Sequence, residues 1–148
     1  MKIYVCSPPI PQSVQTIQQG FNEALFKALN PPWMPMKVVH FGGCTTGDTV
    51  VLRLGPAFLP MMWESLITQH GQTDHSFWFI DEGTRLPFFL KSWKHLHYIR
   101  ETEEGTVIVD DIHLTFSSFI FWPMVFLIRY QMAYRKKAYL RFFNAMRA

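Results

Sequence analysis

Cysteine is scarce in this 148-residue sequence, which contains only Cys6 and Cys44. Two isolated cysteines offer neither the spacing of a metal-binding motif nor the framework of a disulfide-stabilised secreted domain. We therefore expect free thiols in a reducing compartment. The apolar run at residues 3–6 is too short for a signal peptide, and the run at residues 119–128 falls short of the roughly 18 residues that cross a bilayer. These absences predict a soluble, cytoplasmic protein.

Acidic residues are absent from residue 112 to the C-terminus, although the net charge of the whole chain is only +3. The same stretch holds six of the 14 basic residues, which leaves 8 basic against 11 acidic residues in residues 1–111. A basic surface suits RNA or anionic lipid headgroups, whereas a solvated helix face that complements the helix dipole is the simpler alternative. No RNA-module signature accompanies the basic residues, so we expect no nucleic-acid binding and at most transient contact with an anionic membrane. The six residues are Arg129, Arg135, Lys136, Lys137, Arg141 and Arg147.

Aromatic and sulfur-containing side chains are abundant, with 14 Phe, 8 Met and 5 Trp in a chain that is 49% hydrophobic. A single domain spanning residues 1–148 is long enough to bury a core or to surround a cavity. An apolar cavity would use these side chains as its lining. A dense aromatic core, or an exposed patch that forms a homodimer, would use them equally well. Composition therefore leaves both a hollow and a filled interior open, and both a monomer and a homodimer.

Two segments of alternating residue types flank a short acidic turn at residues 103–105. They predict a long antiparallel hairpin. If those three residues form the loop, His97 faces Asp111 and His95 faces His113 across the two strands. A slip of one residue in register would move every side chain to the other face of the sheet.

Further segments predict the rest of an α+β domain. Residues 14–29 carry apolar residues at helical spacing, with Ser13 as a candidate cap and Gly20 as the break between two short helices. Residues 123–147 have no internal glycine and predict a helix of roughly 37 Å at about 1.5 Å per residue. Additional strands are expected at residues 2–6, 37–41, 49–54, 63–69 and 77–81.

The expected terminal helix has an apolar face with two polar exceptions, Gln131 and Arg135. A buried charge there would be costly without a partner. Arg135 could anchor a ligand carboxylate or phosphate inside a cavity, or it could reach the helix edge or pair with an acidic strand residue. The expected apolar face comprises Met124, Leu127, Ile128, Ala138, Tyr139, Phe142, Ala145 and Met146.

Several short motifs follow one another in the order and spacing of a known pattern, F-x-D-E, G-P-F, W-x-H-x-H-x-F, G-T, D-x-V-x-Y and F-x-x-R. The matching residues are Phe79, Asp81 and Glu82, then Pro87 and Phe88, then Trp93, His95 and His97, then Gly105 and Thr106, then Asp110, and finally Phe126 and Arg129. In this pattern the sequence resembles the bacterial branch of the SRPBCC superfamily, which includes START domains and aromatase/cyclases. It departs from the pattern at Leu86, Ile99 and Leu114, so a role of the tyrosine hydroxyl that Leu114 replaces is not transferred.

The resemblance implies a single START-like helix-grip domain, in which a curved antiparallel sheet of six to seven strands surrounds a long C-terminal helix and two short helices follow the first strand. It also implies binding of a small hydrophobic or amphipathic ligand, such as a lipid, a fatty acid or an aromatic polyketide, in an internal cavity. The expected ligand-binding residues are Trp63, Phe79, Trp93, His95, His97, Asp110, Gln131 and Arg135.

Two alternatives involve the histidines more directly. A cyclase or dehydratase acting on polyketides would use His95, His97, Asp110 and Asp111 for acid–base chemistry. No nucleophile motif or cofactor motif accompanies them, so we favour a binding protein over an enzyme. Strand histidines two residues apart permit two metal ligands, but nothing else in the sequence indicates a metal, and we expect neither a metal nor a cofactor.

Overall fold

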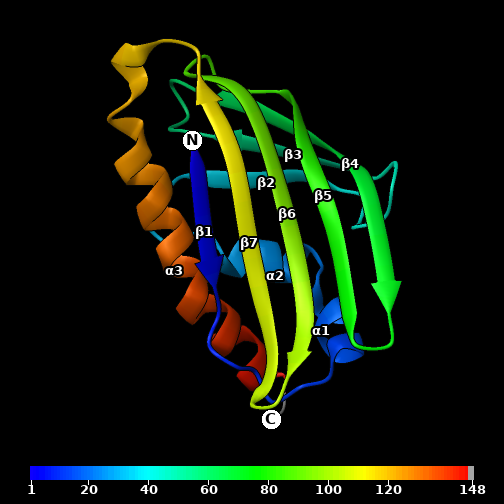
Figure 1. Cartoon of the computed structure of the whole chain (residues 1–148). Coiled ribbons are helices and arrows are strands. Elements are labelled where there is room, and N and C mark those ends of the chain that lie inside the picture. The colour runs from blue at the N-terminus through cyan, green and yellow to red at the C-terminus, as the bar shows by residue number, and fades with distance from the viewer. Residues whose placement is uncertain (147–148) are drawn as a thin grey trace.

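A computed structural model describes residues 1–146 of the chain (Figure 1). The expected last residue of the terminal helix, Arg147, lies outside the described residues. In chain order the elements are β1 (Lys2–Cys6), α1 (Val14–Gly20), α2 (Glu23–Ala28), β2 (Met36–Phe41), β3 (Thr49–Leu54), β4 (Met61–Thr73), β5 (Ser76–Arg85), β6 (Leu90–Thr102), β7 (Gly105–Phe116), the short 3-10 helix η1 (Phe119–Phe121) and α3 (Met124–Ala145).

The strands form one antiparallel sheet in the order β1-β7-β6-β5-β4-β3-β2. Figure 1 shows α3 running along the sheet beside β1 and β7, with α1 and α2 behind the central strands. The seven strands, the two short helices after β1 and the long terminal helix confirm the predicted helix-grip fold. None of the helices within residues 1–146 is long and apolar enough to span a bilayer.

The two short helices form where the sequence predicts them, each with a side-chain cap. The Ser13 hydroxyl accepts from the Thr16 amide at 3.2 Å, and the Asn22 side chain accepts from the Ala24 amide at 2.9 Å. Gly20 ends α1 and is buried against α3, where an added Cβ would collide with the ring of Phe143. Glycine at this position therefore leaves room for the Phe143 ring of α3.

The hairpin between β6 and β7 has a shorter loop than the sequence suggested. Thr102 pairs directly with Gly105, so only two residues form the turn, and Gly105 adopts a positive φ of 131°. The three-residue loop and the register that followed from it are therefore wrong by one residue. His97 pairs with Asp110, and Asp111 points to the opposite face of the sheet.

The buried face of α3 is rotated relative to the expected one. Leu127 and Met146 were expected to be buried but are 39% and 53% exposed. The rotation follows from the position of the helix, which packs against both β1 and α2. The buried residues of α3 are Val125, Ile128, Met132, Arg135, Ala138, Tyr139 and Phe143.

Candidate functional site

Three neighbouring strands bring two histidines and two aspartates together on the inner face of the sheet. Asp81 on β5 pairs with His95 on β6, and His97 on β6 pairs with Asp110 on β7. Cross-strand partners point to the same face, and residues two apart on one strand do so as well. His95, His97 and Asp110 are 2%, 5% and 0% exposed. We refer to Asp81, His95, His97 and Asp110 as the Asp/His cluster.

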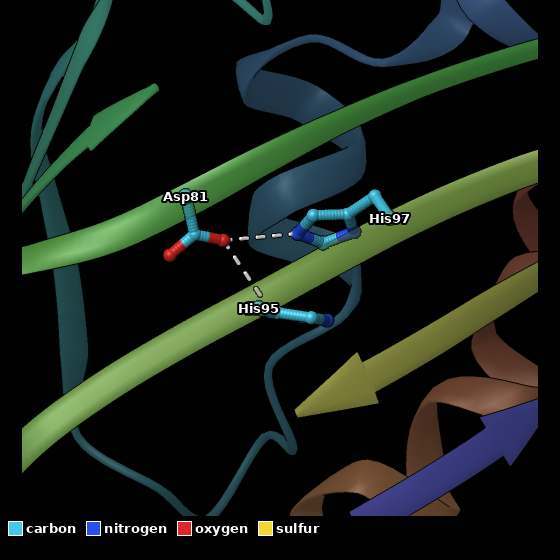
Figure 2. A group of neighbouring side chains, drawn as sticks. All are labelled: Asp81, His95 and His97. Carbon is cyan, nitrogen blue, oxygen red and sulfur yellow. Dashed lines mark hydrogen bonds and ion pairs between the residues drawn. The ribbon is translucent and has the colours of Figure 1, made fainter. Parts of the chain in front are cut away.

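Each imidazole of the Asp/His cluster lies between the two carboxylates. Asp81 Oδ2 lies 3.2 Å from His97 Nε2 and 3.4 Å from His95 Nδ1 (Figure 2). On the other side, His95 Nε2 hydrogen-bonds Asp110 Oδ1 at 3.0 Å. His97 Nδ1 lies 3.1 Å from the same oxygen, but the contact is out of line for a hydrogen bond.

Neighbouring side chains hold the carboxylates and one ring in place. The Trp93 indole N–H donates to Asp81 Oδ1 at 3.1 Å. The Tyr139 hydroxyl of α3 donates to both oxygens of Asp110, each at 3.2 Å. The Phe79 ring stacks on His97 with centroids 4.3 Å apart. These contacts fix the orientation of the Asp/His cluster from three sides.

Both carboxylates of the cluster remain ionised despite their burial. Burial alone would raise the pKa of Asp110, but contacts with His95 and His97 and the charge of Arg135 hold it well below its usual value. Burial likewise acts to raise the pKa of Asp81, and the neighbouring imidazoles and Trp93 outweigh it, so that the pKa is lowered.

The two histidines have different electrostatic environments. Burial, followed by the charge of His97, lowers the pKa of His95 to about 4, so His95 is neutral at pH 7. Burial also acts to lower the pKa of His97, but Asp110 and Asp81 outweigh it and the pKa is raised. Of the two imidazoles, the environment of His97 is therefore the one that favours the protonated form.

Arg135 on α3 points toward the cluster and is only loosely paired. Its side chain is 8% exposed, and NH1 lies 3.8 Å from Asp110 Oδ1. Nε and NH1 have no hydrogen-bond partner among the residues that the structure describes. The sequence left open whether Arg135 pairs with an acidic strand residue or binds a ligand. Asp110 is such an acidic residue, but the contact is long, and two nitrogens of the guanidinium remain without a hydrogen bond.

A cavity of about 110 Å³ lies between the sheet, α2 and α3, and the cluster forms part of its wall. Asp110 is the one expected ligand-binding residue that does not line it, because it lies behind the imidazoles. The expected residues that line it are Trp63, Phe79, Trp93, His95, His97, Gln131 and Arg135.

The cavity volume limits what fits without a change in shape. Ligand pockets commonly measure about 300–1,000 Å³, and a dry cavity of roughly 150 Å³ takes benzene. A volume of about 110 Å³ is smaller than that, so it admits a short chain as it stands and an aromatic ring with a small movement of the lining. A fatty acid or a polyketide needs movement of lining side chains such as Met34 and Met36, which are flexible.

Sequence reasoning misplaced one candidate residue and missed two. Asp111 lies on the outer face, where it pairs with Lys2 at 2.9 Å, and it does not reach the cavity. Asp81 was noted only as part of a motif, although its position two residues after Phe79 places both on one strand face. Tyr139 was assigned to the apolar face, and its hydroxyl partner could not be seen without the fold.

Comparison with known proteins identifies the fold but no close relative. No protein-family profile matches the sequence, and no curated protein matches it. The Zhui aromatase/cyclase from Streptomyces sp. R1128 is similar in structure, with a TM-score of 0.70 at 10% identity over 100% of this chain and 94% of that one. Protein Ms6760 from Mycobacterium smegmatis has a TM-score of 0.65 at 19% identity over 99% and 90% of the two chains. Major latex-like protein 151 from Panax ginseng has a TM-score of 0.59 at 14% identity over 93% and 95%.

These structural neighbours are of the SRPBCC type, so the resemblance expected from the sequence is confirmed for the fold. At sequence identities of 10–19%, the similarity establishes the fold and nothing about the function. The chemistry of the site has to be argued from its own residues.

Proposed function

We propose that this helix-grip protein binds a small, largely apolar molecule that carries one anionic or hydrogen-bond-accepting group. The observation that carries the proposal is Arg135, a buried residue that lines the cavity and whose guanidinium has two nitrogens without a hydrogen-bond partner in residues 1–146. An unmet donor in an apolar setting costs free energy, and a charged one costs more. A ligand oxygen placed at Arg135 would meet these donors in a site of low dielectric, where a charge-assisted hydrogen bond is strong.

The remaining cavity wall favours an apolar body for the ligand. Leu25, Leu29, Leu52 and Phe79 contribute apolar surface, and Gln131 adds an amide beside Arg135 on α3. Removing apolar ligand surface from water contributes about 25 cal/mol per Å². The wall thus supplies affinity, while Arg135 and Gln131 supply orientation and selectivity for an acceptor group.

The proposed ligands are aromatic or short-chain carboxylic acids and their close analogues. Lipids, long fatty acids and aromatic polyketides share this combination of apolar body and oxygen-bearing group. They would fit the cavity only if the lining side chains move apart. The cavity volume places the smaller members of the class first.

The proposal is tested with benzoate as the probe, because it combines one ring with one carboxylate. Isothermal titration of the wild type with benzoate should show saturable binding, and benzyl alcohol should bind more weakly. Arg135→Met should reduce the affinity for benzoate at least tenfold and leave that for benzyl alcohol within about twofold, because a lost charge-assisted bond is worth roughly 1.5–3 kcal/mol. Arg129→Met removes an exposed arginine from the same helix and should change neither affinity. Equal benzoate affinity in Arg135→Met and the wild type, or no saturable binding in the wild type, would contradict the proposal.

A second candidate function is acid–base catalysis of the kind expected for a cyclase or dehydratase. It is supported by the carboxylate–imidazole contact between Asp81 and His97, which reaches the cavity wall, and by the similar fold of an aromatase/cyclase. The cavity volume speaks for the binding function, since a polyketide substrate exceeds it. Turnover of a ketone substrate that His97→Gln abolishes and His75→Gln preserves would favour the enzyme.

Transient contact of the terminal helix with an anionic membrane stays a prediction. Lys136, Lys137 and Arg141 are exposed on α3, opposite its buried face. Co-sedimentation with phosphatidylserine vesicles that falls steeply between low and high salt would support it.

A further inference from the structure

Three potential metal ligands converge at the inner wall of the cavity (Figure 2). One oxygen of Asp81 lies 3.2 Å from His97 Nε2 and 3.4 Å from His95 Nδ1, and the three atoms all lie within 4.8 Å of one another. In a tetrahedral zinc site with bonds of roughly 2.0–2.1 Å, the ligand atoms are about 3.3 Å apart. Both carboxylate–imidazole distances therefore match the spacing of ligands around one ion.

Hydrogen bonding satisfies only one of the two contacts at this point, the one between His97 Nε2 and Asp81 Oδ2. A neutral imidazole has one N–H and one lone pair, and an ionised carboxylate only accepts. The His95 Nε2 hydrogen bond to Asp110 assigns the N–H of His95 to that nitrogen. The lone pair of His95 Nδ1 then faces Asp81 Oδ2, another acceptor, at 3.4 Å. A cation between the two atoms would replace this repulsion with two favourable bonds.

Two of the three candidate ligands also have the hydrogen-bonded outer partner that metal ligands need, and the third, His97, lies next to one. Metal-binding histidines commonly donate their second ring nitrogen to a carboxylate, and bound carboxylates are themselves hydrogen-bonded. Asp110 accepts from His95 Nε2 at 3.0 Å, and it lies 3.1 Å from His97 Nδ1, where a rotation of the ring would bring the contact into line. Trp93 donates to the second oxygen of Asp81 at 3.1 Å. The outer shell of a metal site is thus in place for Asp81 and His95, and the carboxylate that would complete it for His97 is within 3.1 Å.

We infer that Asp81, His95 and His97 form a binding site for one divalent transition-metal ion of the zinc class. All three residues line the cavity, so the remaining coordination position opens into it, as in sites that exchange water for a substrate or ligand. Two imidazole nitrogens and one carboxylate suit Zn²⁺, Co²⁺ or Ni²⁺. The buried negative charges of Asp81 and Asp110 offset the charge of the ion, and Arg135 contacts Asp110 without being a ligand.

This inference reverses the expectation from the sequence, and it goes beyond the proposed ligand binding. The sequence showed only the pair His95 and His97, because the third residue comes from another strand and its position depends on the pairing of β5 with β6. The metal site needs none of the apolar cavity wall, and it can be tested without an organic ligand.

The test uses full-length protein freed of metal by a chelator and then titrated with Zn²⁺ alone by isothermal titration calorimetry. We expect one equivalent to bind, and we expect Asp81→Asn and His97→Gln each to weaken binding at least tenfold. His75→Gln serves as the control, because His75 is exposed and pairs only with Glu101 at the surface. Circular dichroism shows whether each variant remains folded.

A measurement on the wild type alone keeps the inference testable if the variants unfold. Bound Co²⁺ should give the intense visible absorption of a tetrahedral site, and Zn²⁺ should displace it and raise the melting temperature of the protein. An absence of Zn²⁺ binding in the wild type, or equal binding in Asp81→Asn, overturns the inference. Zinc binding without selective benzoate binding would contradict only the proposed function. Selective benzoate binding without zinc binding would contradict only the metal site.

Discussion

His97 on β6 is the direct cross-strand partner of Asp110 on β7, and both side chains are almost fully buried beneath α3. Asp110 also accepts from Tyr139 of α3 and lies 3.8 Å from Arg135. One carboxylate therefore connects the sheet to the terminal helix, directly behind the imidazoles that line the cavity. The site and the helix–sheet contact share the same residues, so the account can be tested through stability as well as through binding.

Replacement of Asp110 should be costly for stability. Asp110→Asn removes the negative charge that His97 and Arg135 face, and removal of one partner of a buried ion pair costs about 3 kcal/mol or more. Urea denaturation followed by circular dichroism measures the loss. Asp111→Asn is the control, because its partner Lys2 is largely exposed and such pairs contribute less than about 1 kcal/mol. Similar stabilities of the two variants would show that Asp110 does not hold the cluster together.

Stability should fall on acidification before the carboxylates titrate. His95 is neutral in the folded protein, with a pKa of about 4, and has its usual pKa near 6.5 when unfolded, so unfolding takes up a proton between these values. The stabilisation is complete above about pH 6.5 and declines as the pH falls toward 4. The raised pKa of His97 acts in the opposite direction near pH 6.5, because there the folded state holds the proton more tightly than the unfolded state. It adds little slope at lower pH, where His97 is protonated in both states.

The measurement is a series of urea denaturations between pH 7 and 4.5 with a chelator present throughout. His95→Gln should flatten the decline, whereas the exposed His75→Gln should retain it. A decline of the same slope in His95→Gln would assign the acid sensitivity to other groups.

Cys44 should react slowly with alkylating reagents. Burial, followed by the nearby charges of Asp48 and Asp81, raises the pKa of the Cys44 thiol to about 12. The reactive thiolate is therefore rare at pH 8.5, and the rate should keep rising at pH values where an ordinary thiol has levelled off. Mass spectrometry after iodoacetamide treatment of Cys6→Ser measures the Cys44 rate. A rate equal to that of unfolded protein at pH 8.5 would contradict the burial of this part of the cavity wall.

The contact between α1 and α3 should tolerate no side chain at Gly20. An added methyl group meets the Phe143 ring, and overpacking of this kind costs about 1–3 kcal/mol. Gly20→Ala should lower the melting temperature, whereas Gln19→Ala, at an exposed position of the same helix, should leave it nearly unchanged. An unchanged melting temperature in Gly20→Ala would show that the helices are farther apart than described.

The elements of the fold could be predicted because their signals are local. Ser13 caps α1, Gly20 separates the two short helices, and Pro123 immediately precedes α3. The register of the last hairpin could not be predicted with the same certainty, because a loop of two residues and a loop of three fit the same alternating pattern. The positive φ of Gly105 allows the shorter turn, and that turn decides which of Asp110 and Asp111 faces inward.

The candidate site combines residues from distant parts of the chain. Only the part of the site on β6 could be predicted from the sequence. His95 and His97 share one face because they are two residues apart. The addition of Asp81 from β5, and of Arg135 and Tyr139 from α3, depends on strand pairing and on the rotation of the helix, neither of which is encoded locally. Composition left a hollow and a filled interior equally open, and the cavity with its volume of about 110 Å³ follows only from how the side chains pack.

The most direct test of the central claim is to locate benzoate on the protein by nuclear magnetic resonance. Titration of isotopically labelled protein should shift the backbone amide signals of cavity-lining residues on β3, β4 and α3, with the Arg135 side-chain Nε–H among those that change most. Shifts confined to residues on the outer face of the sheet, around Asp111 and His113, would contradict the account, as would a spectrum that benzoate leaves unchanged.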